Sequence, residues 1–310
     1  MILDWLLLIV YLILIPPLLL GTIRRTKAGL QNRIGVPIYQ VFFDLAKLCR
    51  KGETLSKTLS WMFRTAFAMN FAFLVSLAIF LPWTVAKPHF AGVDLFYVVY
   101  VFAAARFLTL LAALDSGSAF GAFGASREVT LALMVEPASM LSLAALAVLN
   151  QTSDLTAIFA FGAHPSPTTT GIWLFSGVAI FLAGLVELSR MPIDDPTTHL
   201  ELTMVHEAMI LEASGRNLAL IEYGHALKMT MVFGLVSQCL LHAIPAVYHL
   251  PEALRAVLSL AGIFLIAISL GFAETVMVKL RWRRNPDFIA YSLTMSMLAC
   301  FVAIGRGILH

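Results

Sequence analysis

The chain has 310 residues, of which 60% are hydrophobic and only 13% are charged, about half the charged fraction of a typical soluble domain. Together with a mean hydropathy of +0.87, spread along the whole length, this excludes a water-soluble enzyme, a disordered chain and a nucleic-acid-binding protein. The net charge of +3, from 21 Lys and Arg against 18 Asp and Glu, is too near balance to predict an anionic partner.

Eight mostly apolar stretches recur along the chain, each near the roughly 20 residues that an α-helix needs to cross a bilayer. Their length and the lack of strict alternation favour helices over membrane-spanning strands. We therefore expect an all-α membrane protein with about eight transmembrane helices, forming a single integral membrane domain over residues 1–310. The predicted spans are 3–21, 63–85, 95–114, 129–148, 171–188, 226–247, 253–280 and 288–308.

Basic residues concentrate between the first and second spans. Nine of them lie from Arg24 to Arg64, and four more follow the seventh span at 279–284. Because cytoplasmic loops carry an excess of lysine and arginine, this side is predicted to be cytoplasmic, and both chain ends then lie on the outer side. The predicted cytoplasmic loops are about 22–62, 115–128, 189–225 and 281–287.

Within the first of these loops, apolar and polar side chains repeat with helical spacing. Tyr39, Phe42 and Phe43 recur opposite Asp44 and Lys47. This pattern predicts an amphipathic helix in the plane of the membrane interface, and it is equally typical of a docking surface for a soluble subunit.

Three ionisable residues, Arg106, Glu136 and Glu274, fall inside predicted spans. A charge at this depth is costly unless it is paired, solvated or neutralised, so each is a functional candidate by default. The alternative is structural, with Arg106 paired to one acid and Glu274 extending toward the interface.

Glycine, alanine and serine dominate the segment from Asp115 to Glu128. We expect a broken segment with open backbone that lines a cavity, where Asp115, Arg127 and Glu128 supply polar partners. The alternative is a tight connection in which Ser126 caps the start of the fourth span.

Acidic residues concentrate between the fifth and sixth spans. Seven of the chain's 18 carboxylates lie in 36 residues, opposed only by Arg190 and Arg216. Crowding of like charges raises carboxylate pKa values toward the range useful for proton exchange, which predicts a proton-handling region; an acidic docking face is the alternative. The seven are Glu187, Asp194, Asp195, Glu201, Glu207, Glu212 and Glu222.

The histidines and cysteines do not predict a metal site. His199 and His206 lie near these acids, but no second histidine follows His206 at a spacing of four. The three cysteines lie far apart without a C-x-x-C motif, so neither a disulfide nor an iron–sulfur cluster is predicted. Proton transfer suits His199 and His206 better, whereas His225, His242 and His249 are expected at span ends without partners.

Two sequence motifs can be recognised, one in the first predicted loop and one after the fifth predicted span. The first, R-x-G followed by Q-x-x-x-D-x-x-K-L, contains Arg33, Gly35, Gln40, Asp44 and Lys47. The second, E-x-x-R-x-P-x-D, starts at 187, contains an arginine at 190 and an aspartate at 194, and is followed by glutamates at 201 and 212. Both resemble subunit 1 of respiratory complex I, although threonine 197 and histidine 199 stand where that family commonly has glutamates.

Further motifs resemble one branch of that family. They are A-R-F around Arg106, L-D-x-G at Asp115, G-A-S-R-E with Arg127 and Glu128, and V-E-P with Glu136. These runs are similar to those of the membrane subunits of group 4 nickel–iron hydrogenases, such as formate hydrogenlyase and hydrogenase-4-type complexes.

The resemblance implies a membrane anchor and coupling subunit in the cytoplasmic (inner) membrane of a bacterium or archaeon. Its implied partners are hydrogenase-like large and small subunits, a ferredoxin-like iron–sulfur subunit and antiporter-like membrane subunits. The nickel–iron centre and iron–sulfur clusters would lie in those partners, and this chain would hold no redox cofactor. Its own task would be to link electron transfer in the docked subunits to translocation of protons or Na⁺.

The resemblance also assigns residues. Arg33, Gly35, Gln40, Asp44 and Lys47 would dock a soluble subunit. A proton path would enter at the acids of the second motif, continue through Glu128 and Glu136, and use arginines as charge partners. The predicted path and coupling set is Glu187, Asp194, Asp195, Glu201, Glu207, Glu212, Asp115, Glu128, Glu136, Arg106, Arg127 and Arg190.

Three alternatives remain open. The chain could be the quinone-site subunit of an NADH dehydrogenase-like complex, which requires an amphipathic tunnel formed by the first span and the interfacial loop. It could be a stand-alone ion transporter, although the two halves show no detectable inverted repeat. It could also be a scaffold whose acids only orient its partners.

Overall fold

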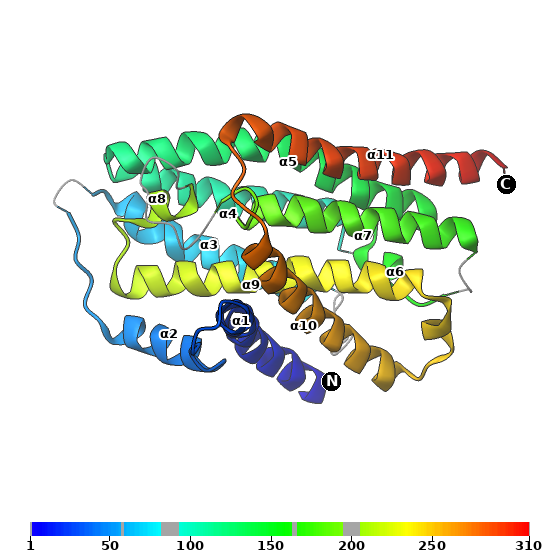
Figure 1. Cartoon of the computed structure of the whole chain (residues 1–310), viewed down its shortest axis with the longest axis horizontal. Helices are drawn as coiled ribbons and strands as arrows, with labels where there is room; N and C mark the ends of the chain where they lie inside the picture. Colours follow the sequence, from blue (N-terminus) through cyan, green and yellow to red (C-terminus); the bar gives the residue numbers. More distant parts are fainter. Residues whose placement is uncertain (1, 57–58, 82–92, 163–165, 195–204, 310) are drawn as a thin grey trace.

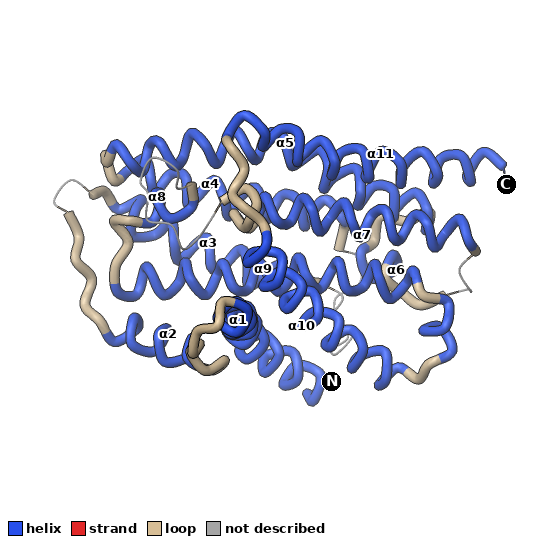
Figure 2. The backbone as a smooth tube through the Cα atoms, in the orientation of Figure 1, coloured by secondary structure: helices blue, strands red, loops and turns tan. Residues whose placement is uncertain are grey.

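The computed structural model describes residues 2–56, 59–81, 93–162, 166–194 and 205–309, and these form helices and loops without a β-strand (Figure 2). Within these ranges, eight helices are long and apolar enough to cross a membrane, which confirms the predicted fold class. The described helices are α1 (Ile2–Leu30), α2 (Gln40–Arg50), α3 (Trp61–Phe80), α4 (Leu95–Asp115), α5 (Ala119–Asn150), α6 (Leu155–Ile158), α7 (Pro167–Glu187), α8 (His206–Ile210), α9 (Gly215–Ala243), the 3₁₀ helix η1 (Pro245–His249), α10 (Glu252–Val276), the 3₁₀ helix η2 (Trp282–Arg284) and α11 (Asn285–Leu309).

The long helices form a bundle with α9 at its centre. In the most apolar window of α9, 89% of residues are buried, against 28–56% for the other seven long helices. α3, α7, α10 and α1 pack around α9, while α11 lies along α5 and α7 on one side of the bundle (Figure 1). Helices other than α9 therefore present much of their apolar surface outward, as expected for contact with lipid.

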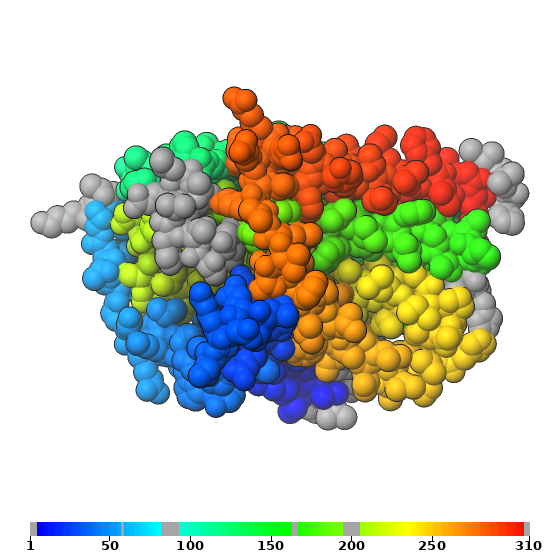
Figure 3. All heavy atoms as spheres, in the orientation of Figure 1, coloured from blue at the N-terminus to red at the C-terminus, as the bar shows by residue number. Residues whose placement is uncertain are grey.

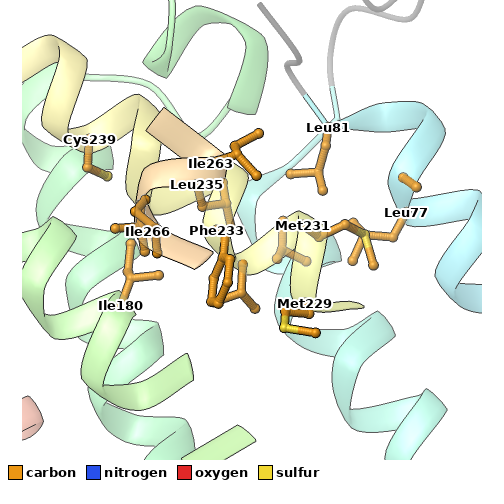
Figure 4. Close-up of a cluster of buried hydrophobic side chains, with 14 of the residues drawn as sticks. Leu77, Leu81, Ile180, Met229, Met231, Phe233, Leu235, Cys239, Ile263 and Ile266 are labelled. Atoms are coloured by element: carbon orange, nitrogen blue, oxygen red, sulfur yellow. The ribbon is translucent and has the colours of Figure 1, made fainter. Parts of the chain in front are cut away.

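The hydrophobic core is built on α9. Met229, Met231, Phe233 and Leu235 point from it toward side chains of three neighbouring helices, among them Ile180 on α7 (Figure 4). Unbranched methionine side chains fill irregular gaps between helices that cross at different angles. The core therefore holds α9 fixed against the helices that carry the charged residues described below.

The segment predicted as an open loop at 115–128 is instead mostly helical, so this prediction was wrong. α4 ends at Asp115, Gly117 adopts a positive φ of 63°, and Ser118 caps α5 by accepting a hydrogen bond from the Gly121 amide at 3.0 Å. The N-cap is thus Ser118 and not Ser126. Small residues in this run serve packing: a Cβ on Gly124 would lie 2.9 Å from the Val205 carbonyl oxygen.

Two other predicted loops are shorter than expected. α9 begins at Gly215, so Glu222 and His225 lie within a helix and not in a 189–225 loop. α1 continues to Leu30, beyond the predicted start of the first loop. The amphipathic helix predicted in that loop exists as α2, which buries Val41 and contacts α1 and α9.

The connection between α10 and α11 crosses the surface of the molecule in an extended conformation. It lies over the face that also carries α1 and α10, and is visible as the orange segment in Figure 3. Val278 in this connection is 82% exposed, whereas the next residue, Lys279, reaches back to Asp194. The backbone amide of Leu280 donates to the Pro192 carbonyl at 2.8 Å, which ties the connection to the segment after α7.

Candidate functional site

Arg106 on α4 lies at the centre of a buried group of charges. Its Nη1 contacts Glu136, its Nη2 contacts Glu187, and its Nε lies 3.7 Å from Glu128 Oε1. The side chain of Arg106 is only 7% exposed. Each nitrogen of one planar guanidinium therefore faces a different carboxylate, contributed by α5 or α7.

Lys228 on α9 completes this group. Its Nζ lies 2.6 Å from Glu187 Oε1 and donates to the Glu187 backbone carbonyl at 3.3 Å. The five residues Arg106, Glu128, Glu136, Glu187 and Lys228 are called the Arg106 cluster below. Three carboxylates facing two cations give the cluster a formal charge of −1.

Local packing explains why these side chains meet. On α3, the Asn70 amide donates to the Ala105 carbonyl at 2.8 Å and to the Thr109 hydroxyl at 2.6 Å, which fixes α4 on either side of Arg106. Gly184 on α7 lets α9 approach closely, since a Cβ there would lie 2.4 Å from a Val232 methyl. That close approach, one turn before Glu187, brings Lys228 within reach of its carboxylate.

Glu136 is the most exposed member of the cluster. Its side chain is 33% exposed, against 7–13% for the other four. Pro137 follows it and lacks the backbone N–H that would continue the hydrogen bonding of α5 at that turn. Glu136 is therefore the point at which the cluster comes nearest to the outside of the bundle.

A second charged network joins α1, α10 and the segment after α7. Glu274 Oε2 lies 3.0 Å from Lys27 Nζ, and its Oε1 lies 3.5 Å from Arg190 Nη1. The Glu274 side chain is fully buried, so it does not extend toward the interface as one interpretation of the sequence required. The network holds two cations and one anion, opposite in balance to the Arg106 cluster.

Asp194 anchors the segment that leads to α8. Its Oδ1 lies 2.6 Å from Lys279 Nζ, and its Oδ2 accepts the backbone amide of Val205 at 3.0 Å. The residue is 2% exposed. Asp194 therefore positions the residue immediately before His206.

A large cavity of about 590 Å³ lies between α1, the residues after it and α9. Exposed residues including Gln31, Arg33 and Ile34 form its outer part, while Arg190, Asp194, Lys27, Glu207 and Glu222 line it with charge. His206 and His225 also line it. It is a polar cavity that reaches from the surface to the buried charges.

Two smaller cavities of about 50 Å³ each continue inward. The inner cavity touches Glu128, Lys228 and the two histidines, and shares Arg106 and Glu187 with the other. The other small cavity does not touch the histidines. It is mostly apolar, is lined by residues such as Phe102 and Leu143, and has Glu136 on its wall. The three cavities therefore follow one another from the surface to Glu136, each sharing wall residues with the next.

His206 and His225 lie against each other, with ring centroids 5.2 Å apart. The expectation that His225 lacks a partner was therefore wrong. Burial lowers the pKa of His206 to about 4, aided by the nearby Lys228 and Arg190 cations and opposed by Asp194. At neutral pH the His206 ring is uncharged.

Several predicted path residues lie apart from the Arg106 cluster. Asp115 accepts the backbone amide of Ser60 at 2.9 Å, and Glu212 is exposed at the surface. Arg127 lies over the Phe123 ring at 3.9 Å and over the Trp282 ring at 5.6 Å. Asp195 and Glu201 lie outside the described residues, as does His199.

The residues predicted to dock a soluble subunit lie along one edge of the large cavity and on α2. Arg33 and Gly35 line the cavity, and the Gly35 carbonyl accepts from Arg25 at 2.6 Å. Asp44 accepts from the Gln40 amide at 3.2 Å, and Lys47 follows in the last turn of α2.

Sequence reasoning missed Lys27, Lys228 and Lys279, each of which pairs with a buried acid. Lys228 carried a usable signal, because it is an isolated lysine inside the apolar stretch 226–247. Lys27 and Lys279 gave no such signal, since they stand among other basic residues near span ends. In the described part of the chain, no three His, Cys, Asp or Glu residues converge to hold a metal ion.

Two known proteins are similar to this chain in sequence. The chain is 34% identical over 230 residues to hydrogenase-4 component C and 31% identical over 220 residues to formate hydrogenlyase subunit 4, both from Escherichia coli (strain K12). These alignments cover 73% and 70% of this chain and 71% and 70% of the relatives.

A solved structure shares the fold. The match is to a chain of the membrane-bound sulfane sulfur reductase, an archaeal respiratory membrane complex, with a TM-score of 0.79 and 18% identity, over 97% of this chain and 99% of that one. The model of the NADH dehydrogenase family matches residues 3–305. The chain therefore belongs to the NADH dehydrogenase family, the subunit 1 family of complex I, as a multi-pass membrane subunit related to those of the hydrogenase-type complexes.

Proposed function

We propose that this chain is the anchor and coupling subunit of a complex I-like, membrane-bound hydrogenase, linking electron transfer in docked soluble subunits to proton or Na⁺ translocation. The observation that carries the proposal is the series of three neighbouring cavities, with shared wall residues, that leads from the surface past the Arg106 cluster to Glu136. Buried ionisable groups are costly in a membrane protein, and a connected series of them favours ion movement over a purely structural role.

The Arg106 cluster is suited to storing and passing a proton. Its uncompensated negative charge favours uptake of one proton, and Glu136, as its most exposed acid, is the natural exit toward a neighbouring membrane subunit. A change of charge near the large cavity alters the field at these carboxylates, because low-dielectric surroundings screen it little. Electron transfer in a docked subunit can thereby change the proton occupancy of the cluster.

The proposed partners are those of related hydrogenase-type complexes, and the surface of the chain suggests where each would dock. Hydrogenase-like large and small subunits and a ferredoxin-like subunit would dock beside the large cavity and α2, where Arg33, Gly35, Gln40, Asp44 and Lys47 lie. Antiporter-like subunits would meet the side on which Glu136 is exposed. The nickel–iron centre and iron–sulfur clusters would belong to the soluble partners, in the cytoplasmic membrane of a bacterium or archaeon.

The test replaces Glu187 or Glu136 by Gln in the intact complex, which keeps side-chain size while removing the titratable proton. We expect ion translocation to fall while electron transfer within the soluble module continues. The exposed Glu212→Gln serves as the control. If translocation per electron stays at the wild-type value in both the Glu187 and the Glu136 variants, the coupling proposal fails.

The second candidate function is that of a quinone-site subunit in an NADH dehydrogenase-like complex. The large cavity favours it, because this cavity lies beside α1 and residues 31–36, where such a subunit would need a tunnel. Turnover of the purified complex with a quinone, compared with turnover with ferredoxin or formate, separates the two. If the complex turns over with a quinone but not with ferredoxin or formate, the chain belongs to the quinone-reducing branch.

A further inference from the structure

Two histidines form the junction between the large cavity and the inner one. His206 is the first residue of α8, His225 lies in the first half of α9, and their ring planes are inclined by 35° at a centroid distance of 5.2 Å. Of all described residues, only these two line both cavities. A proton that moves between the cavities therefore passes this pair.

Charged groups face the histidine pair from every element packed around it. Cations from α9 and from the segment after α7 oppose the binding of two protons by the pair, whereas the acids on the inner side attract a proton that has reached it. The groups are Arg24 and Lys27 on α1, Arg33 after α1, Arg106 on α4, Glu128 on α5, Glu187 on α7, Arg190 and Asp194 after α7, Glu207 on α8, and Glu222 and Lys228 on α9.

We infer that His206 and His225 are the proton-transfer step between the large cavity and the Arg106 cluster, an assignment that rests on the proposed coupling function. A neutral imidazole accepts a proton on one ring nitrogen and releases one from the other. Each transfer moves one proton from a donor in the large cavity, through the two rings, to a carboxylate of the cluster. No electron moves, and the pair returns to its uncharged state after each transfer.

Asp194 is the positioning residue for this step. It holds the amide of Val205, the residue before His206, while its other oxygen binds Lys279. A shift of Asp194 therefore moves His206 relative to His225, which is fixed on the central helix α9.

The test uses the intact complex in proteoliposomes, with electron transfer and proton translocation measured separately. We expect His206→Gly and His225→Gln to lower translocation about 100-fold, the low end for loss of a positioned proton-transfer group, while electron transfer continues. Added imidazole should restore translocation in His206→Gly, because the large cavity reaches this position from the surface. The control is His249→Gln, an exposed histidine in η1 beyond the far end of α9, which should leave both rates unchanged.

The outcomes separate this inference from the proposed function. If Glu187→Gln abolishes translocation but both histidine variants retain it, the relay is overturned and the coupling function stands. If Glu187→Gln also retains it, the coupling function fails as well. If His206→Gly loses translocation and imidazole restores none, the histidine has a structural role and the relay is again overturned.

Discussion

Replacing Arg106 by Gln removes the one cation that all three carboxylates of the Arg106 cluster contact. At an effective dielectric constant of about 20, a unit-charge pair separated by the 3.7 Å between Arg106 and Glu128 attracts by about 4 kcal/mol. Desolvation offsets part of this, but removing one partner from a buried ion pair still destabilises a protein by about 3–5 kcal/mol, because the remaining charge is uncompensated. We expect Arg106→Gln to lower the free energy of unfolding by that amount.

The chain offers a control at the same separation. Arg24 and Asp44 lie 3.6 Å apart, but their side chains are 48% and 47% exposed. Exposed pairs contribute only about 0–1 kcal/mol, so Arg24→Gln should change stability by less than about 1 kcal/mol. Burial and the number of carboxylates that one arginine contacts make the difference.

The free energy of unfolding is measured by denaturant or heat, in one detergent, for Arg106→Gln, for Arg24→Gln and for the double variant Arg106→Gln/Glu187→Gln. Removing an anion together with the cation should recover part of the loss, giving a coupling energy of about 1–3 kcal/mol. Equal small losses in Arg106→Gln and Arg24→Gln, or strictly additive effects in the double variant, would refute the reasoning that these charges form a buried, interdependent network.

Three further predictions follow from packing, titration and orientation. Gly184→Ala should destabilise the chain by about 1–3 kcal/mol, because its Cβ meets a Val232 methyl at 2.4 Å, whereas Gly29→Ala, which meets nothing within 4 Å, should be neutral or stabilising in the same unfolding assay. The pKa of His206 is about 4 in the folded chain and 6.5 in a free histidine, so the unfolded chain binds a proton first as the pH falls. The free energy of unfolding should therefore be highest above pH 6.5 and should decrease by about 3 kcal/mol as the pH falls to 4. His206→Gln should make the free energy of unfolding less dependent on pH in this range. The exposed thiol of Cys49 in α2 should react with a membrane-impermeant maleimide only from the cytoplasmic side, and labelling only from the outer side would reverse the predicted orientation.

The sequence by itself determined the architecture. Each span is a long local signal, since about 20 apolar residues must form a helix to satisfy their backbone in lipid. It also singled out Arg106, Glu136 and Glu187, because charges are rare in or beside such stretches and because their motifs are those of the family. α2 was predictable for the same local reason, its periodic amphipathic pattern.

The small-residue segment shows where local composition misled. Glycine, alanine and serine favour open backbone in isolation, and this predicted a broken loop before the fourth span. In the fold these residues form the first turns of α5, because their small side chains let α5 approach the segment around Val205. Close packing between distant segments, not local preference, decided their conformation.

Only the tertiary structure decided which charges meet. Arg106 and Glu187 are 81 residues apart, and Lys27 and Glu274 stand at opposite ends of the chain. No local pattern distinguishes an acid that joins the Arg106 cluster from one, such as Glu212, that remains in solvent. Which charges pair depends on where the helices cross and on how side chains pack around α9. Both are set by contacts between helices that are far apart in the sequence, so neither can be derived from a local pattern.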